Sequence, residues 1–199
     1  MKTKIAVLVS GGGTNLQALI DAQGKTLISG EIALVVANNA GAYALERAKK
    51  AGIETAVVLK KECGSQEAFE DRLMALLDEK GIEVIILAGF MTILTERFTS
   101  RYPKRILNVH PSLIPSFCGE GFYGLRVHEE ALKYGVKVTG ATVHFVNEIP
   151  DGGEIIAQKA VSIQDGDTPE ILQRRVMEQA EWILLPQAAE TVCHALGGK

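Results

Sequence analysis

The chain has 199 residues, of which 47% are hydrophobic and 23% are charged, and its formal net charge at pH 7 is −3. This length fits a single domain, residues 1–199, and the composition is that of an ordinary soluble globular protein. The small negative charge argues against nucleic acid bound by bulk electrostatics, so an anionic ligand would have to be held by local geometry. The apolar runs are too short for a membrane span or a secretory leader, and we expect a cytoplasmic protein with no membrane partner.

The cysteines and two of the histidines give no sign of a metal site. Cys63, Cys118 and Cys193 are odd in number, widely spaced and outside any CxxC pattern, so we expect reduced thiols. His128 and His194 have no ligand spacing to another histidine, cysteine or acid. We therefore expect no bound metal.

Short apolar runs alternate with helical patterns over the first 134 residues. Each run is continuous, which is typical of a strand that is covered on both faces. The runs are residues 5–9, 32–37, 54–59, 84–88 and 106–109. The segments with helical spacing are residues 16–20, 43–51, 66–80 and 125–134. This alternation predicts an α/β, Rossmann-like doubly wound sheet whose strands are mostly parallel.

The pattern changes after residue 134. Two further strands are expected at Val138–Phe145 and Ile155–Ile163, separated by a loop. A long C-terminal helix is expected to begin after Thr168-Pro169. Together with the first five strands, these predict a seven-stranded sheet with helices on both faces. Three segments then share the edge where open α/β sheets bind ligands: Ser10–Asn15, Gly89–Leu94 and Asn108–Pro115.

Asn108 and His110 lie at the end of the fifth strand, which Pro111 terminates. Side chains alternate along a strand, so these two project from the same face, roughly 7 Å apart. An amide and an imidazole in this arrangement suit the stabilisation of an oxyanion and the movement of a proton. They would equally suit local hydrogen bonds to the backbone, and the two residues alone do not decide between these readings.

The glycine turn Ser10–Asn15 is not a dinucleotide fingerprint. The third glycine position is occupied by Leu16, and the second strand ends in Asn38-Asn39 instead of an acid. The turn also lacks the lysine of a Walker A loop. What remains is a glycine turn before a helix N-terminus with the hydroxyl of Thr14, which suits a phosphate monoester. The alternative is a tight turn that binds nothing.

Two loops leave alternatives open. Asp151 precedes two glycines, so it could form a turn, or it could direct a carboxylate at His110, raise the imidazole pKa and order its tautomer. The loop Gly89–Leu94 carries four apolar side chains. They could cap the core, which the sequence alone favours, or they could line a slot for a flat heterocycle.

Four segments resemble a known family when they are taken together: Ser10–Gln17, Leu87–Met91, Asn108–Pro115 and Val143–Gly153. The family is phosphoribosylglycinamide formyltransferase, the folate-dependent transformylase of de novo purine synthesis. The resemblance runs from the first strand to about Pro186. The Asn-Val-His-Pro segment is similar in other formyl transferases and hydrolases of tetrahydrofolate, whereas the Gly-Thr-Asn loop near the amino terminus points to this family.

The resemblance implies roles for residues of this chain. It implies that Asn108, His110 and Asp151 are catalytic. It also implies a substrate site for the nucleotide phosphate and sugar, formed by Gly13, Thr14, Asn15 and Glu181. A folate pocket is implied at two loops, by Phe90, Met91, Thr92, Ile93, Leu94, Val146, Asn147, Glu148 and Asp151. Thr92 and Gln66 stand where some relatives carry arginine, and the segment Phe117–Gly124 is longer than in some members.

The implied activity is formyl transfer from 10-formyltetrahydrofolate, as co-substrate, to the amine of 5-phosphoribosylglycinamide. The alternative is a 10-formyltetrahydrofolate hydrolase, which would use the same three residues with water but carries an additional amino-terminal domain. Methionyl-tRNA formyltransferase would need a carboxy-terminal RNA-binding domain and a basic surface. We therefore expect small-molecule partners and no nucleic acid; the sequence leaves a weak homodimer open.

Overall fold

The structure is a computed structural model and describes residues 2–197. Its centre is a seven-stranded sheet in the order β3-β2-β1-β4-β5-β6-β7. The strands are β1 (Thr3–Val9), β2 (Gly30–Ala37), β3 (Glu54–Val57), β4 (Val84–Leu87), β5 (Ile106–His110), β6 (Val138–Phe145) and β7 (Ile155–Ser162). The first five strands are parallel, and β6 and β7 are added antiparallel beyond β5. The predicted doubly wound, mostly parallel sheet is confirmed.

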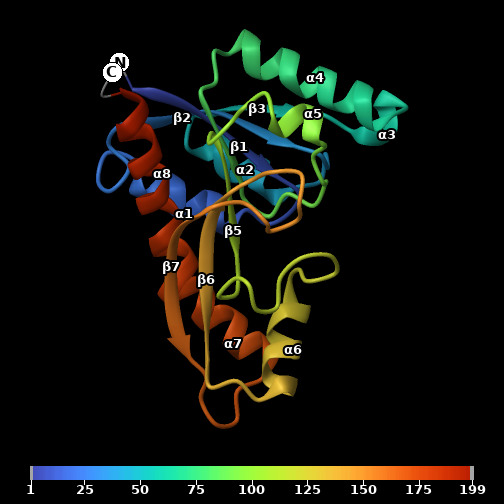
Figure 1. Cartoon of the computed structure of the whole chain (residues 1–199). Helices are drawn as coiled ribbons and strands as arrows, with labels where there is room; N and C mark the ends of the chain where they lie inside the picture. Colours follow the sequence, from blue (N-terminus) through green and yellow to red (C-terminus); the bar gives the residue numbers. More distant parts are fainter. Residues whose placement is uncertain (1, 198–199) are drawn as a thin grey trace.

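Helices cover both faces of the sheet (Figure 1). They are α1 (Thr14–Ala22), α2 (Tyr43–Lys50), α3 (Lys60–Cys63), α4 (Gln66–Glu79), α5 (Glu96–Thr99), α6 (Leu125–Tyr134), α7 (Pro169–Val176) and α8 (Trp182–Gly197). Apolar side chains of α1, α2 and α8 form one core with the sheet, and those of α4 and α5 form a second core on the opposite face. This two-sided cover explains why the parallel strands read as continuous apolar runs.

The C-terminal helix begins where the sequence predicts it. The Thr168 hydroxyl caps α7 by accepting a hydrogen bond from the Ile171 N–H, and Pro169 occupies the first helical position. Between α7 and α8, however, residues Met177–Glu181 form a π-helical turn, η1. A π turn takes in an extra residue and so changes which side chains face the core. Here it leaves Ala180 in the core and Glu181 buried at the end of the turn.

The order of the strands creates a switch point between β1 and β4. From β1 the chain proceeds through β2 and β3 on one side, and then returns to place β4 and β5 on the other. The turns after β1 and β4 therefore meet, with the Ser10 N–H donating to the Gly89 carbonyl at 3.2 Å and the Met91 N–H to the Ser10 hydroxyl at 2.9 Å. Ligands bind open α/β sheets at such a point. Over residues 2–197, no helix combines the length and apolarity that a membrane span requires.

Candidate active site

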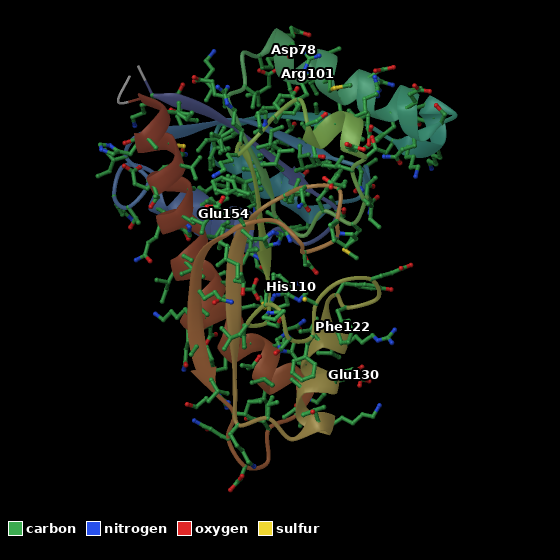
Figure 2. The ribbon with its side chains drawn as sticks, viewed as in Figure 1. Asp78, Arg101, His110, Phe122, Glu130 and Glu154 are labelled. Carbon is green, nitrogen blue, oxygen red and sulfur yellow. The ribbon has the colours of Figure 1, made fainter. Side chains whose placement is uncertain are left out.

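Asn108, His110 and Asp151 come together at the carboxyl end of β5. The first two project from one face of the strand, as their spacing predicts, while Asp151 reaches them from the loop between β6 and β7. Asp151 Oδ2 lies 3.4 Å from His110 Nδ1, and Asp151 Oδ1 lies 3.4 Å from Asn108 Nδ2. Figure 2 labels His110 in the middle of the molecule, between the sheet and the loop that leads to α6. Asp151 is therefore directed at His110, as one of the two readings predicts.

His144 is a fourth member of this cluster, to which the sequence analysis assigns no role. The antiparallel register pairs Asn108 with His144, so both face the same side. His144 Nε2 lies 3.2 Å from Asn108 Nδ2 and 3.6 Å from Asp151 Oδ1. Its other nitrogen, Nδ1, lies 2.8 Å from the Phe145 carbonyl, which can only accept, so Nδ1 carries the proton. Nε2 then accepts from the Asn108 amide and holds it in place.

The glycine turn presents backbone N–H groups at the start of α1. Gly13 has a left-handed backbone, φ 71°, and no side chain within residues 2–197 caps the helix there. A Cβ at this position would lie 2.6 Å from that of Ala44, so the close approach of α2 also requires glycine. Arg47 donates from Nε to the Gly12 carbonyl at 2.8 Å and holds the turn. Thr14 is exposed at the first helical position, as a phosphate site would require.

Asn15 connects this turn with the π turn η1. Its Nδ2 donates to Glu181 Oε2 at 2.8 Å, although 166 residues separate the two in the chain. Among residues 2–197 the amide oxygen of Asn15 has no partner. Burial raises the pKa of the Glu181 carboxyl above its ordinary value, more than the hydrogen bond from Asn15 lowers it. A hydroxyl-rich ligand could supply the polar partners that this pair lacks.

Two cavities meet at Asn108 and Asp151. A cleft of about 750 Å³ extends from them past His110 to Asn15 and Glu181. A smaller pocket of about 140 Å³ lies between the loop after β4 and the loop after β6. It is lined by the nine residues for which the resemblance implies a folate pocket, from Phe90 to Leu94 and Val146, Asn147, Glu148 and Asp151.

The apolar side chains of the loop Gly89–Leu94, here called the apolar loop, take two different roles. Leu94 is buried in the core and Phe90 is partly buried against it. Met91 and Ile93, by contrast, are 56% and 67% exposed and line both cavities. The expectation that the loop caps the core is therefore wrong for Met91 and Ile93, because they follow a sharp turn that carries them beyond the end of the strand.

A formyl transferase family model matches residues 3–188. The phosphoribosylglycinamide formyltransferase of Haemophilus influenzae is 44% identical over 88% of this chain and 81% of its own length. The chain belongs to the formyl transferase family. The resemblance to phosphoribosylglycinamide formyltransferase that the motifs indicate is thereby confirmed.

Solved structures of formyl transferases share this fold. Glycinamide ribonucleotide transformylase 1 from Symbiobacterium toebii superposes with a TM-score of 0.90 at 40% identity, over 98% of this chain and 89% of that one. Another relative is much longer. The trifunctional purine biosynthetic protein adenosine-3 of Gallus gallus is 47% identical over 96% of this chain, which spans only 18% of that protein.

One prediction from the sequence, that the Asp151 carboxylate raises the pKa of His110, is corrected by the structure. Asp151 acts in the expected direction, but burial lowers the pKa of His110 more than Asp151 and the Phe117 carbonyl raise it, so the net shift is downward. Burial raises the pKa of Asp151, yet its contacts with His144 and His110 and the hydrogen bond from the Gly119 N–H together lower it below its ordinary value. At neutral pH this formyl transferase therefore holds a neutral imidazole beside a carboxylate.

Thr92 and Gln66, where the resemblance implies an arginine in some relatives, take structural roles. Thr92 accepts from Asn38 Nδ2 at 2.9 Å. Gln66 donates to the Ile93 carbonyl at 3.1 Å and to Glu70 at 2.7 Å, and so attaches the apolar loop to the start of α4. Within residues 2–197, no group of three or more histidine, cysteine, aspartate or glutamate side chains is placed to hold a metal ion.

Proposed function

We propose that this chain transfers the formyl group of 10-formyltetrahydrofolate to the amine of 5-phosphoribosylglycinamide, in de novo purine synthesis. The observation that carries the proposal is the meeting of two cavities at Asn108 and Asp151. A two-substrate transfer needs two sites that open onto one reacting atom. Two relatives of which this chain covers 81% and 80% carry the name of this activity.

The nucleotide is assigned to the large cleft. The free N–H groups at Gly13, Thr14 and Asn15 would receive its phosphate, because a helix N-terminus attracts anions without a net positive protein charge. Glu181 lines the same cleft beside Asn15 and would accept hydrogen bonds from the ribose hydroxyls. One continuous cavity runs from Asn15, the last residue of the turn, to His110, which suits a phosphoribosyl group with a short amine-bearing arm.

The folate ring is assigned to the smaller pocket. Apolar side chains such as Phe90 and Leu94 would pack against a flat heterocycle, while backbone groups of the loop Val146–Asp151 would read its polar edge. The volume of the pocket, about 140 Å³, fits the ring end of a folate and leaves its tail outside. We expect a loop of this kind to close further when folate binds.

The chemistry follows from the four clustered side chains. The substrate amine attacks the formyl carbon and forms a tetrahedral oxyanion, to which the Asn108 amide donates while His144 holds that amide. Neutral His110 is able to accept at Nδ1 the proton that the amine loses, and Asp151 stabilises the imidazolium that results. The bond from the formyl carbon to folate N10 then breaks, and N10 receives the proton. One carbon is transferred and no covalent enzyme intermediate is required.

The test mixes the purified protein with both substrates and follows the release of tetrahydrofolate. We expect release only when the nucleotide is present, with one formyl group gained by the nucleotide for each folate released. Release at the same rate without nucleotide would instead favour the hydrolase. We expect no nucleic-acid or membrane partner and a cytoplasmic location.

A further inference from the structure

The eight residues Phe117–Gly124, here called the aromatic loop, connect the strand-end segment to α6. Their backbone is unusual, because Phe117, Gly119, Gly121 and Gly124 all have positive φ, between 49° and 86°. Three of these positions are glycine, for which the conformation carries no penalty. Phe117, at φ 49°, is a bulky residue in the left-handed region, and such a residue is held there only when its surroundings demand it, at a cost of roughly 1 kcal/mol or more.

The ring of Phe117 is held by two other aromatic residues. Its centroid lies 6.4 Å from that of Phe122, within the same loop, and 6.0 Å from that of Tyr134 at the end of α6, edge to face. Figure 2 labels Phe122 below His110, on the side of α6. The Phe122 N–H also donates to the Gly119 carbonyl at 3.1 Å. These contacts attach the strained residue to a regular helix.

The backbone of the aromatic loop contacts both His110 and Asp151, here called the proton-transfer pair. The Phe117 carbonyl lies 2.8 Å from His110 Nε2, and a carbonyl can only accept, so Nε2 carries a proton. In the neutral ring, Nδ1 is then the unprotonated nitrogen, and it faces Asp151 Oδ2 at 3.4 Å. Two residues further on, the Gly119 N–H donates to that same Oδ2 at 2.9 Å.

We propose that the aromatic loop is the positioning element for this pair, in which the Phe117 carbonyl sets the tautomer of His110 and the Gly119 N–H sets the orientation of Asp151. The inference rests on the proposed formyl transfer, since it assigns the proton of the attacking amine to Nδ1. The opposite tautomer would direct a lone pair of Nε2 at the Phe117 carbonyl and leave no proton acceptor beside Asp151. Other titratable groups around the pair are His144 on β6, His128 on α6 and Cys118 in the loop.

The tautomer is tested on the unaltered protein by nitrogen NMR with labelled histidine, His110 being identified as the signal lost in His110→Gln. We expect a protonated Nε2 and an unprotonated Nδ1 at neutral pH. A protonated Nδ1 in the neutral ring would overturn the proposal. This measurement needs no substrate, so it decides the positioning even if the protein fails to transfer formyl groups, which would contradict the proposed function alone.

The orientation of Asp151 is tested with Gly119→Ala. No described atom lies within 4 Å of an added Cβ at Gly119, so the substitution acts through its φ of 86° and moves the N–H. We expect kcat to fall roughly tenfold or more, because small misplacements are costly, while the KM for the nucleotide changes little. We also expect the acidic limb of the kcat profile, which reports the base His110, to move to higher pH, since a carboxylate that loses a hydrogen-bond donor stabilises the neighbouring imidazolium more strongly.

The matched control is Gly135→Ala at the end of α6. Gly135 has nearly the same φ, 83°, and equally open surroundings in the described part of the chain, but it lies outside the loop. We expect its pH profile to coincide with that of the unaltered protein. If Gly119→Ala is too unstable, Phe117→Ala removes the ring contacts and should give mixed tautomers of His110. Profiles or tautomers that coincide in all variants would overturn the proposal.

Discussion

At the scale of single residues, both groups that would move the proton are largely buried. His110 and Asp151 are 6% and 12% exposed as side chains, and burial is the largest influence on the pKa of each. The outcome is a neutral base next to a carboxylate, which can accept a proton at neutral pH without first losing one. Asp151 can also adopt its φ of 55° more readily than most residues, because aspartate and asparagine tolerate the left-handed region.

Asp151→Asn should abolish the stabilisation of the His110 imidazolium while it preserves the fold, because asparagine accepts the same backbone conformation. We expect kcat to fall by about 10² to 10⁴ and nucleotide affinity to survive, as measured by tetrahydrofolate release and by calorimetric titration. Asp165→Asn, the same change in an exposed loop, is the control. Near-normal turnover in Asp151→Asn would contradict the role proposed for this carboxylate.

His128 should make the protein sensitive to acid. It is fully buried in α6, both its ring nitrogens lack partners among the described residues, and burial, followed by the charge of His110, lowers its pKa from 6.5 to about 4. The unfolded chain therefore binds a proton first as the pH falls. This contribution to stability is complete above pH 6.5 and is lost towards pH 4, with a full size of about 3 kcal/mol.

The measurement is urea unfolding at pH 7.5 and pH 4.5. We expect the unaltered protein to lose about 2 to 3 kcal/mol more over this range than His128→Leu, which has nothing to titrate there. His194→Leu, at an exposed position, should behave like the unaltered protein. An equal pH dependence in all three proteins would mean that the buried imidazole is already hydrated or paired.

At the scale of elements, two local features shape the cleft. The glycine turn brings the start of α1 against α2, and the π turn in the C-terminal helix places Glu181 opposite Asn15. The first feature is visible in the sequence because only glycine tolerates both the left-handed φ and the contact with Ala44. The second is not visible, because one additional residue in a turn does not interrupt the helical pattern enough to be recognised.

Gly13→Ala should weaken both the fold and the nucleotide site. An added Cβ lies 2.6 Å from Ala44 Cβ and also strains a φ of 71°, so we expect a loss of about 2 to 4 kcal/mol in unfolding free energy. Gly24→Ala has a similar φ, 75°, and no described atom within 4 Å, and should lose only about 1 kcal/mol. Equal losses in the two variants, measured by denaturant unfolding, would show that the contact with α2 is unimportant.

At the scale of the whole molecule, the sheet order assembles the site. Placing β4 and β5 beside β1, on the side opposite to β2 and β3, gathers the segments that follow these three strands at one edge. The antiparallel β6 then adds His144 and the loop that carries Asp151. Residues from the first turn to the C-terminal helix thus enclose one cleft, and a ligand that binds there should stabilise the entire domain.

A thermal-shift experiment tests this global effect. Glycinamide ribonucleotide at about one hundred times its Kd should add about 2.7 kcal/mol of stability, which corresponds to a rise in Tm of several degrees for a domain of this size. NAD should give no rise, because the glycine turn lacks the dinucleotide pattern. Equal stabilisation by both compounds would contradict the assignment of the cleft.

The sequence by itself determined the strands, the longer helices and the candidate residues that follow them, because these depend on local periodicity and on turn chemistry; the one-turn helices α3 and α5 were not predicted. It placed Asn108 and His110 on one face, and it identified the glycine turn and the start of α7. The tertiary structure alone decided which distant groups meet: Asp151 with His110, His144 with Asn108, and Asn15 with Glu181. It also reversed the expected pKa shift of His110, because the cost of burying a charge depends on everything packed around it.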